Sequence, residues 1–243
     1  MLNRFALAGL ALLCLISFSC RRSKANEPWI SRHAPWSDGE VSTYDVLKGD
    51  TIVGKSVYTI RSAETGGRQV WEIVGVNSSE SGGLHDSIAA ALSFDELKSL
   101  SSFQVRDAIA RLDTVVSSYA GSKVKVTARA GQTQTLPISA NTFDSSILLM
   151  AIRTLDLRPD AHYLLTSVSS FVPWTKPADV QVLGDETVKV PSGEFACRKL
   201  ALQIAGMTMN LWYERDAPHR YVKFENRNNN STAVLTTYTA GSR

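Results

Sequence analysis

Residues 180–238, VQVLGDETVKVPSGEFACRKLALQIAGMTMNLWYERDAPHRYVKFENRNNNSTAVLTTY, decide the fold of this chain. Apolar and polar residues alternate along the stretch in five short runs, which are separated by Gly, Pro, Asn and Asp. Alternation at period two predicts strands with one buried face, and short turns between them predict antiparallel neighbours. The last quarter of the chain is therefore expected to form an antiparallel meander.

The same alternation extends upstream to residue 39, and it predicts strands at 40–47, 52–61, 69–76, 88–94 and 124–127. The Ser- and Gly-rich segment 77–86 is expected to be a loop. The segment 104–119 fits two patterns, because its apolar residues suit one face of a helix and also a strand. The turn at 120–122 that follows favours a β-hairpin, and a helix remains the alternative.

One helix is expected, at residues 144–155. Asp144 is a suitable N-cap, and Arg153 near the far end complements the helix dipole. Leu148, Ile152 and Leu155 recur at helical spacing, and nearly every residue from 147 to 152 is apolar. A helix that is apolar on almost all sides must be buried. The expected fold class is therefore mainly β, a curved, half-open antiparallel β-barrel or meander wrapped around one buried helix.

Residues 1–19 have the pattern of an export signal. Arg4 precedes an apolar run that is too short to span a membrane, and small residues precede Cys20. This pattern predicts a lipoprotein signal with Cys20 as the lipidated first residue, and a plainly cleaved secretory signal is the alternative. Residues 20–38 are expected to be a tether and residues 39–243 a single β-rich domain. The predicted location is the periplasmic side of the cell envelope, and Arg21 favours the outer membrane.

Charge and cysteine content narrow the possible partners. The chain has 26 Lys and Arg against 23 Asp and Glu, and the two signs are mixed along the strands. Nucleic-acid binding is not expected, because phosphate backbones require clustered basic residues. Cys14 lies in the signal and Cys20 is the lipidation site, which leaves Cys197. We expect Cys197 to be a small buried residue rather than a reactive thiol.

Three segments occur in a recognisable order: GEVSTYDVLKGDTIVGKSVYTI at 39–60, FDSSILLMAIRTLDLRPDAHY at 143–163, and DETVKVPSGEFACRKL with MNLWYERDAPHRYVKFE within 185–225. Together they resemble a family of exported bacterial proteins of unknown function, with an architecture similar to periplasmic lipoprotein-localisation (LolA/LolB-like) carriers. The resemblance covers most of the mature chain and implies a half-closed antiparallel barrel around a helix. In the carriers that hollow holds acyl chains. The family has no catalytic residues to carry over.

No catalytic, metal or cofactor site is expected, and the protein is predicted not to be an enzyme. The four histidines are far apart in the sequence and lack the spacing of zinc ligands. The chain contains no Gly-x-Ser-x-Gly motif and no Gly-rich loop that would hold phosphate before a helix. His85, Asp86 and Ser87 are adjacent, so they cannot face one another as a catalytic triad does.

A binding site is the stronger expectation. Methionine adapts to flexible chains, and the candidates for lining a ligand site are Met207, Met209, Leu211, Tyr213, Leu148, Ile152, Trp71 and Trp212. The first hypothesis is a lipid-anchored envelope protein that binds an apolar ligand, such as a lipid or the acyl chain of a lipoprotein. The alternative is an envelope structural or interaction protein with a packed core and no ligand.

Overall fold

The computed structural model describes residues 33–81, 84–108 and 111–242. The expected signal at 1–19, the lipidation site Cys20 and most of the expected tether lie outside the described residues. Within the described ranges, no helix is both long enough and apolar enough to cross a membrane.

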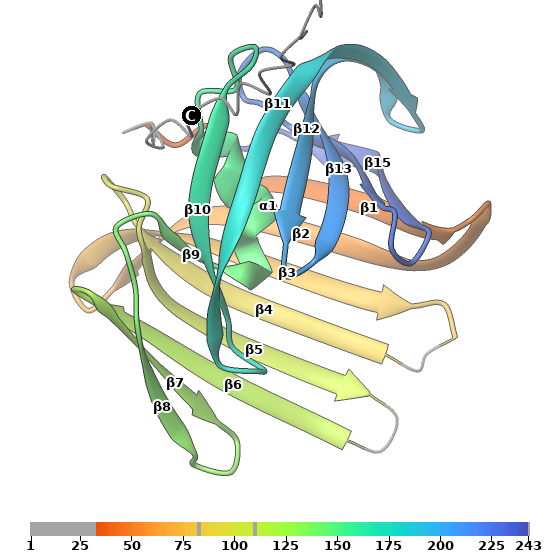
Figure 1. The fold of residues 1–243 in the computed structure, drawn as a ribbon. Coiled ribbons are helices and arrows are strands. Elements are labelled where there is room, and N and C mark those ends of the chain that lie inside the picture. Colours follow the sequence, from red (N-terminus) through yellow and green to blue (C-terminus); the bar gives the residue numbers. More distant parts are fainter. Residues whose placement is uncertain (1–32, 82–83, 109–110, 243) are drawn as a thin grey trace, which may run out of the picture.

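One continuous sheet of fifteen strands curls around a short helical segment (Figure 1). Its first half is a meander in chain order, made of β1 (Glu40–Lys48), β2 (Thr51–Thr65), β3 (Arg68–Ser79), β4 (Leu84–Ser93), β5 (Ser99–Ala108), β6 (Arg111–Ala120), β7 (Lys123–Ala128) and β8 (Thr133–Pro137). Its second half contains β9 (Thr142–Asp144), β10 (His162–Ser169), β11 (Trp174–Val190), β12 (Gly193–Ile204), β13 (Met207–Glu214), β14 (Tyr221–Asn226) and β15 (Ser231–Thr239). The antiparallel pairing of β1 with β15 joins the two halves.

The sheet does not close into a barrel by backbone pairing. Its two ends are β8 and β9, and β9 pairs only with β10, to which it is parallel. Side chains of β9 instead contact β5 and β6, while β6, β7 and β10 share a second, smaller core of Val115, Tyr119, Val124, Val126 and Val168. The expected fold class, a curved and half-open antiparallel sheet around a helix, is confirmed.

The helical segment is shorter and more broken than the sequence predicts. A single α-helical turn, α1 (Leu148–Ala151), lies between two 3₁₀ turns, η1 (Ser145–Ile147) and η2 (Ile152–Thr154). Isolated segments of this length have little helical stability of their own, so the surrounding sheet sets their geometry. The predicted burial is confirmed, and the enclosed residues with at most 4% exposure include Ile147, Leu148, Met150, Ala151 and Ile152.

The strand predictions hold with one clear correction. The five runs of the C-terminal stretch are β11 to β15, and the segment 104–119 forms most of the β5–β6 hairpin rather than a helix. The segment 77–86 is not simply a loop, because β3 continues to Ser79 and β4 begins at Leu84. Ser and Gly weaken strand propensity, but cross-strand pairing on both sides overrides it here.

The end of the expected tether is part of the packed fold. Trp36 is 5% exposed, and its ring meets Trp71 edge to face with a centroid separation of 6.2 Å. Asp38 accepts a hydrogen bond from the Ser62 backbone N–H and pairs with Ser242 in an isolated bridge. Trp36 therefore packs onto the domain instead of belonging to a free tether.

Candidate functional site

Seven of the eight predicted lining residues lie in the core, with exposed fractions between 0 and 8%: Met209, Leu211, Tyr213, Leu148, Ile152, Trp71 and Trp212. Met207 is 40% exposed and lies outside the core that encloses the other seven. It begins β13 immediately after the tight turn Ala205–Gly206, where both residues have positive φ and the hairpin ends. Among five surface hollows of about 320 to 690 Å³, only one is bordered by any of the eight, and that residue is Met207.

The two predicted tryptophans pack against different neighbours. Trp71 stacks on Phe94 with a centroid separation of 5.1 Å. Trp212 donates from its indole N–H to Glu186, and the ammonium groups of Lys199 and Lys223 lie 5.0 and 4.8 Å from its ring centroid. Lysine stems and cation–π contacts cover the Trp212 ring, so it does not line an interior space.

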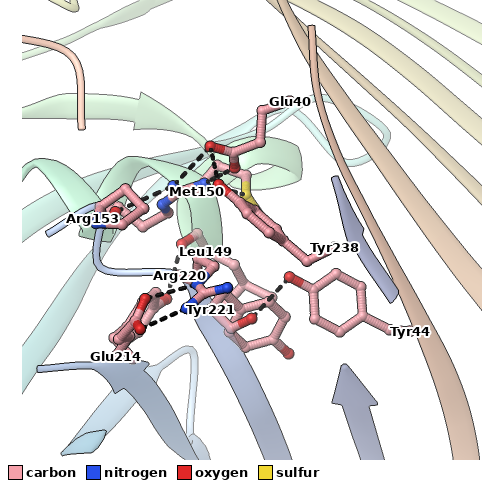
Figure 2. Close-up of polar contacts among 11 residues, drawn as sticks. Glu40, Tyr44, Leu149, Met150, Arg153, Glu214, Arg220, Tyr221 and Tyr238 are labelled. Atoms are coloured by element: carbon pink, nitrogen blue, oxygen red, sulfur yellow. Dashed lines mark hydrogen bonds and ion pairs between the residues drawn. The ribbon is translucent and has the colours of Figure 1, made fainter. Parts of the chain in front are cut away.

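A buried ion pair joins the first strand to the helical segment (Figure 2). Arg153 donates to both carboxylate oxygens of Glu40 at 2.5 and 3.2 Å, and each side chain is 1% exposed. Arg153 also donates to the Pro218 carbonyl at 3.1 Å, and the Tyr238 hydroxyl donates to Glu40 at 3.2 Å. Arg153 was predicted to complement the helix dipole. Its main interaction is instead the ion pair with Glu40, which is 113 residues away in the sequence.

Three tyrosines fill the space beside this ion pair. Tyr44 and Tyr221 have ring centroids 4.8 Å apart, and Tyr213 and Tyr221 have centroids 5.7 Å apart. The Tyr44 hydroxyl donates to the Tyr221 carbonyl at 2.9 Å, and the Tyr213 hydroxyl donates to the Leu149 carbonyl at 2.8 Å. The region between α1 and the C-terminal strands is thus occupied by aromatic rings, and the hydroxyls of Tyr44 and Tyr213 already have partners.

These tyrosines predict a loss of stability at alkaline pH. Burial raises the pKa of Tyr44, Tyr213 and Tyr221, whereas an unfolded tyrosine has a pKa of about 10. Their stabilising contribution is complete below pH ~10 and falls as the pH rises toward the folded pKa values, by about 1.4 kcal/mol per pH unit for each tyrosine. Urea unfolding between pH 8 and pH 11 measures this fall. Tyr44→Phe should reduce the slope, and an unfolding free energy that stays constant across this range would contradict the prediction.

A second polar cluster closes the seam between β9 and the β5–β6 hairpin. The Asp144 carboxylate is 1% exposed and receives hydrogen bonds from five residues. One oxygen accepts from Gln104 at 3.0 Å and from both the backbone and hydroxyl of Ser146 at 3.0 and 2.6 Å. The other accepts from the hydroxyls of Ser102, Tyr119 and Ser170 at 2.6, 2.8 and 3.3 Å. Because a carboxylate has about four lone-pair sites, the bonds from these five residues use the acceptor capacity of Asp144 in holding the seam.

Part of this cluster was visible in the sequence. The predicted capping role of Asp144 is confirmed by its bond to the Ser146 backbone N–H. The partners on β5 and β6 were missed, although Ser102 and Gln104 alternate with outward residues and so mark a polar inner face. Burial and the neighbouring Asp144 charge raise the pKa of the Tyr119 hydroxyl, which stays protonated and donates to that carboxylate.

The cysteine prediction is confirmed for packing. Cys197 is 1% exposed, and burial together with the Glu214 and Glu186 charges raises the pKa of its thiol to about 12. The thiolate needed for nucleophilic chemistry is therefore scarce at neutral pH. In the part of the chain that the structure describes, no group of His, Cys, Asp and Glu residues is arranged to hold a metal ion.

Comparison with known proteins gives a family and a fold. The model of a family described as "Protein of unknown function (DUF3108)" matches residues 40–236. A beta-barrel-like protein of domain of unknown function DUF1849 from Brucella abortus is similar in structure, with a TM-score of 0.58 at 9% identity over 85% of this chain and 99% of that one. A Bacteroides fragilis protein predicted to be exported, with a YmcC-like fold, matches with a TM-score of 0.39 at 12% identity over 86% and 99% of the two chains. No curated protein matches the chain.

Proposed function

Because the chain belongs to the DUF3108 family, whose function is unknown, we propose its function from its own geometry. The protein is an exported, lipid-anchored component of the cell envelope that has a packed core. It acts as an interaction or structural protein through its surface and carries no acyl chain inside. This is the second of the two hypotheses that the sequence raised, and it does not require a catalytic group.

The filled interior is the observation that carries this proposal. An acyl chain between α1 and the C-terminal strands would have to displace Tyr44, Tyr213 or Tyr221, which are 0 to 3% exposed. It would also lie against the buried Glu40–Arg153 pair. Placing hydrocarbon beside charged and hydrogen-bonded groups breaks their partnerships, and each orphaned buried polar group costs about 1–3 kcal/mol. The geometry therefore favours a packed domain over a carrier.

The lipid anchor is proposed from the N-terminal sequence. Cys20 follows an apolar run and small residues, as the first residue of a lipoprotein does. Two or more acyl chains provide stable anchoring, because each buried methylene contributes about 0.8 kcal/mol. The 13 residues from Cys20 to residue 32 extend to at most about 45 Å, so the packed domain would work close to the membrane surface.

Metabolic labelling tests the anchor. Cells that express the full chain are grown with radiolabelled palmitate, and the purified protein is examined for label. We expect label in the wild type and in Cys14→Ala, the matched control whose cysteine lies inside the signal. Cys20→Ala should carry none. An unlabelled wild type, or label that persists in Cys20→Ala, would overturn the anchored form of the proposal.

A further inference from the structure

The geometry points to a glycan-binding groove on the inner face of β2 to β5, at the mouth of the half-barrel. The ligand is an uncharged, hydroxyl-rich saccharide chain of several units. This inference deepens the proposed function, because it names the class of envelope molecule that the surface binds. The inference depends on the proposed function only for the protein's location in the cell envelope. The groove itself is formed by described residues alone.

A row of polar side chains crosses five neighbouring strands. Ser56 is directly opposite Asn77, Asn77 is opposite Asp86, and Asp86 is opposite Arg106. Arg106 is in turn opposite Asp113 on β6. Adjacent strands are about 4.8 Å apart, so the row is about 19 Å long. The row lies on the inner face of the sheet. The neighbouring row on the same face contains Gly75, Ile88 and Gln104, and Gln104 donates to Asp144.

Surface hollows follow the row. A hollow of about 320 Å³ lies between β2–β5 and the η1 and β10 ends, and Asn77, Asp86, Arg106, Ser146 and Phe171 are among its lining residues. A hollow of about 410 Å³ shares Asn77 and Asp86 with it, and one of about 690 Å³ shares Phe171. The central hollow therefore shares lining residues with a hollow on either side. Each has the size of a small-molecule site, and their succession suits an extended ligand.

The polar groups in the central hollow are only partly used by the protein. Asn77 accepts from the Ser56 hydroxyl at 2.6 Å, which leaves its amide NH₂ as a donor. Arg106 is held over the Phe171 ring at 4.2 Å and is 46% exposed. Its Nε lies 3.4 Å from one oxygen of Asp86, which is buried and makes no hydrogen bond in the described structure. The Asn77 amide and the exposed Arg106 guanidinium thus lie beside the Asp86 carboxylate, and both retain N–H groups that can donate to a ligand.

Sugar hydroxyls match this mixture of groups. Each hydroxyl both donates and accepts, so neighbouring hydroxyls can bind an amide, a carboxylate and a guanidinium in turn. The apolar C–H face of a sugar ring can pack on Phe171 or on Tyr58, which borders the hollow beside Gly75. A side chain at Gly75 would clash with Tyr58, since an added Cβ would lie 2.9 Å from its ring.

Other ligand classes fit the groove less well. A peptide that adds a strand needs a free sheet edge, whereas β2 to β6 are paired on both sides. Burying Asp86 and Arg106 under an acyl chain would leave charges without partners. A nucleic acid would meet acidic Asp86 and Asp113 among the cations Lys55 and Arg106, and mixed signs weaken binding to phosphates.

Titration with defined saccharides tests the groove. The probes are tetra-N-acetylchitotetraose, maltotetraose and the corresponding monosaccharides, added to the full chain in detergent and followed by calorimetry. We expect at least one tetramer to bind about tenfold or more tightly than its monomer, because several units contact the row. Arg106→Gln and Asp86→Asn should each weaken that binding about tenfold. The matched control Lys125→Gln alters an exposed cation that alternates with the buried Val124 and Val126 on β7, and it should leave binding unchanged.

Each outcome of the titration decides the inference. No binding by any tetramer, binding that Arg106→Gln and Asp86→Asn leave intact, or displacement of the saccharide only by a free fatty acid would overturn it. Circular dichroism of every variant excludes loss of folding as the cause of weakened binding. Cys20→Ala is expected to bind the tetramer like the wild type, so failure of the anchor and failure of the groove give different results.

Discussion

Arg153→Met is expected to lower the free energy of unfolding by about 3–5 kcal/mol, because it leaves the Glu40 carboxylate buried without its partner. The pair is 1% exposed on both sides, and it joins β1 to the helical segment (Figure 2). Glu40→Leu should cost a similar amount, since Arg153 would then be the orphaned charge. The double variant Glu40→Leu/Arg153→Met should recover most of the loss, because two apolar side chains of similar volume need no partner.

Urea unfolding followed by tryptophan fluorescence measures these four proteins. Lys98→Met serves as the control, because Lys98 pairs with Glu96 at 3.0 Å on the surface and both side chains are at least half exposed. An exposed pair of this kind is worth about 0–1 kcal/mol. If Arg153→Met were no more destabilising than Lys98→Met, the ion pair would not hold β1 to the helical segment.

Asp144→Asn is the second substitution for which we expect a loss of about 3–5 kcal/mol. The amide keeps the shape of the side chain but presents an NH₂ group to hydroxyls that donate to the carboxylate, such as those of Ser102 and Tyr119. Hydrogen bonds to a charged group contribute about 1.5–3 kcal/mol each, and several are lost together here. Because Asp144 closes the seam, β9 and β10 should also lose protection from hydrogen exchange.

Hydrogen-exchange mass spectrometry separates this local effect from a general loss of stability. Asp185→Asn is the matched control, since Asp185 is half exposed and pairs with Arg198 at 2.8 Å. In Asp144→Asn, peptides from β9, β10 and the β5–β6 hairpin should exchange faster, while peptides from β12 and β13 change least. Equal acceleration throughout the sheet, or none, would show that the seam does not depend on this carboxylate.

The strands were predictable because each depends mainly on local alternation. The runs from 180 to 238 correspond to β11 through β15, and the turn at 120–122 correctly indicated a hairpin, that of β6 and β7. The division of 104–119 between two strands, β5 and β6, was not predicted. The segment 77–86 was misassigned because its Ser and Gly content suggests a loop, whereas pairing with β2 and β5 extends both strands. How far the sheet winds was not predictable, since it depends on side chains of β9 meeting β5 and β6.

The sites were harder to predict than the strands, because their residues are distant in sequence. Glu40 and Arg153 are 113 residues apart, and nothing local to either one indicates the other. Apolar spacing correctly placed Leu211 and Tyr213 in the core, but it cannot distinguish a packed core from a lined hollow. Met207 shares their alternation and is exposed, because the strand begins at a hairpin end beyond the core. The likeness to lipoprotein carriers stays a prediction.

Mass spectrometry of organic extracts tests the packed core most directly. The full chain is purified from membranes in a detergent that exchanges free lipid, and the extract is compared with that of the Cys20→Ala protein. The packed core predicts no lipid or fatty acid at a stoichiometric level beyond the chains proposed to be attached to Cys20. The contrary result is one equivalent of a non-covalent acyl ligand that is absent from the Leu211→Trp variant, whose larger side chain would displace it. That result would contradict the packed core and restore the carrier hypothesis.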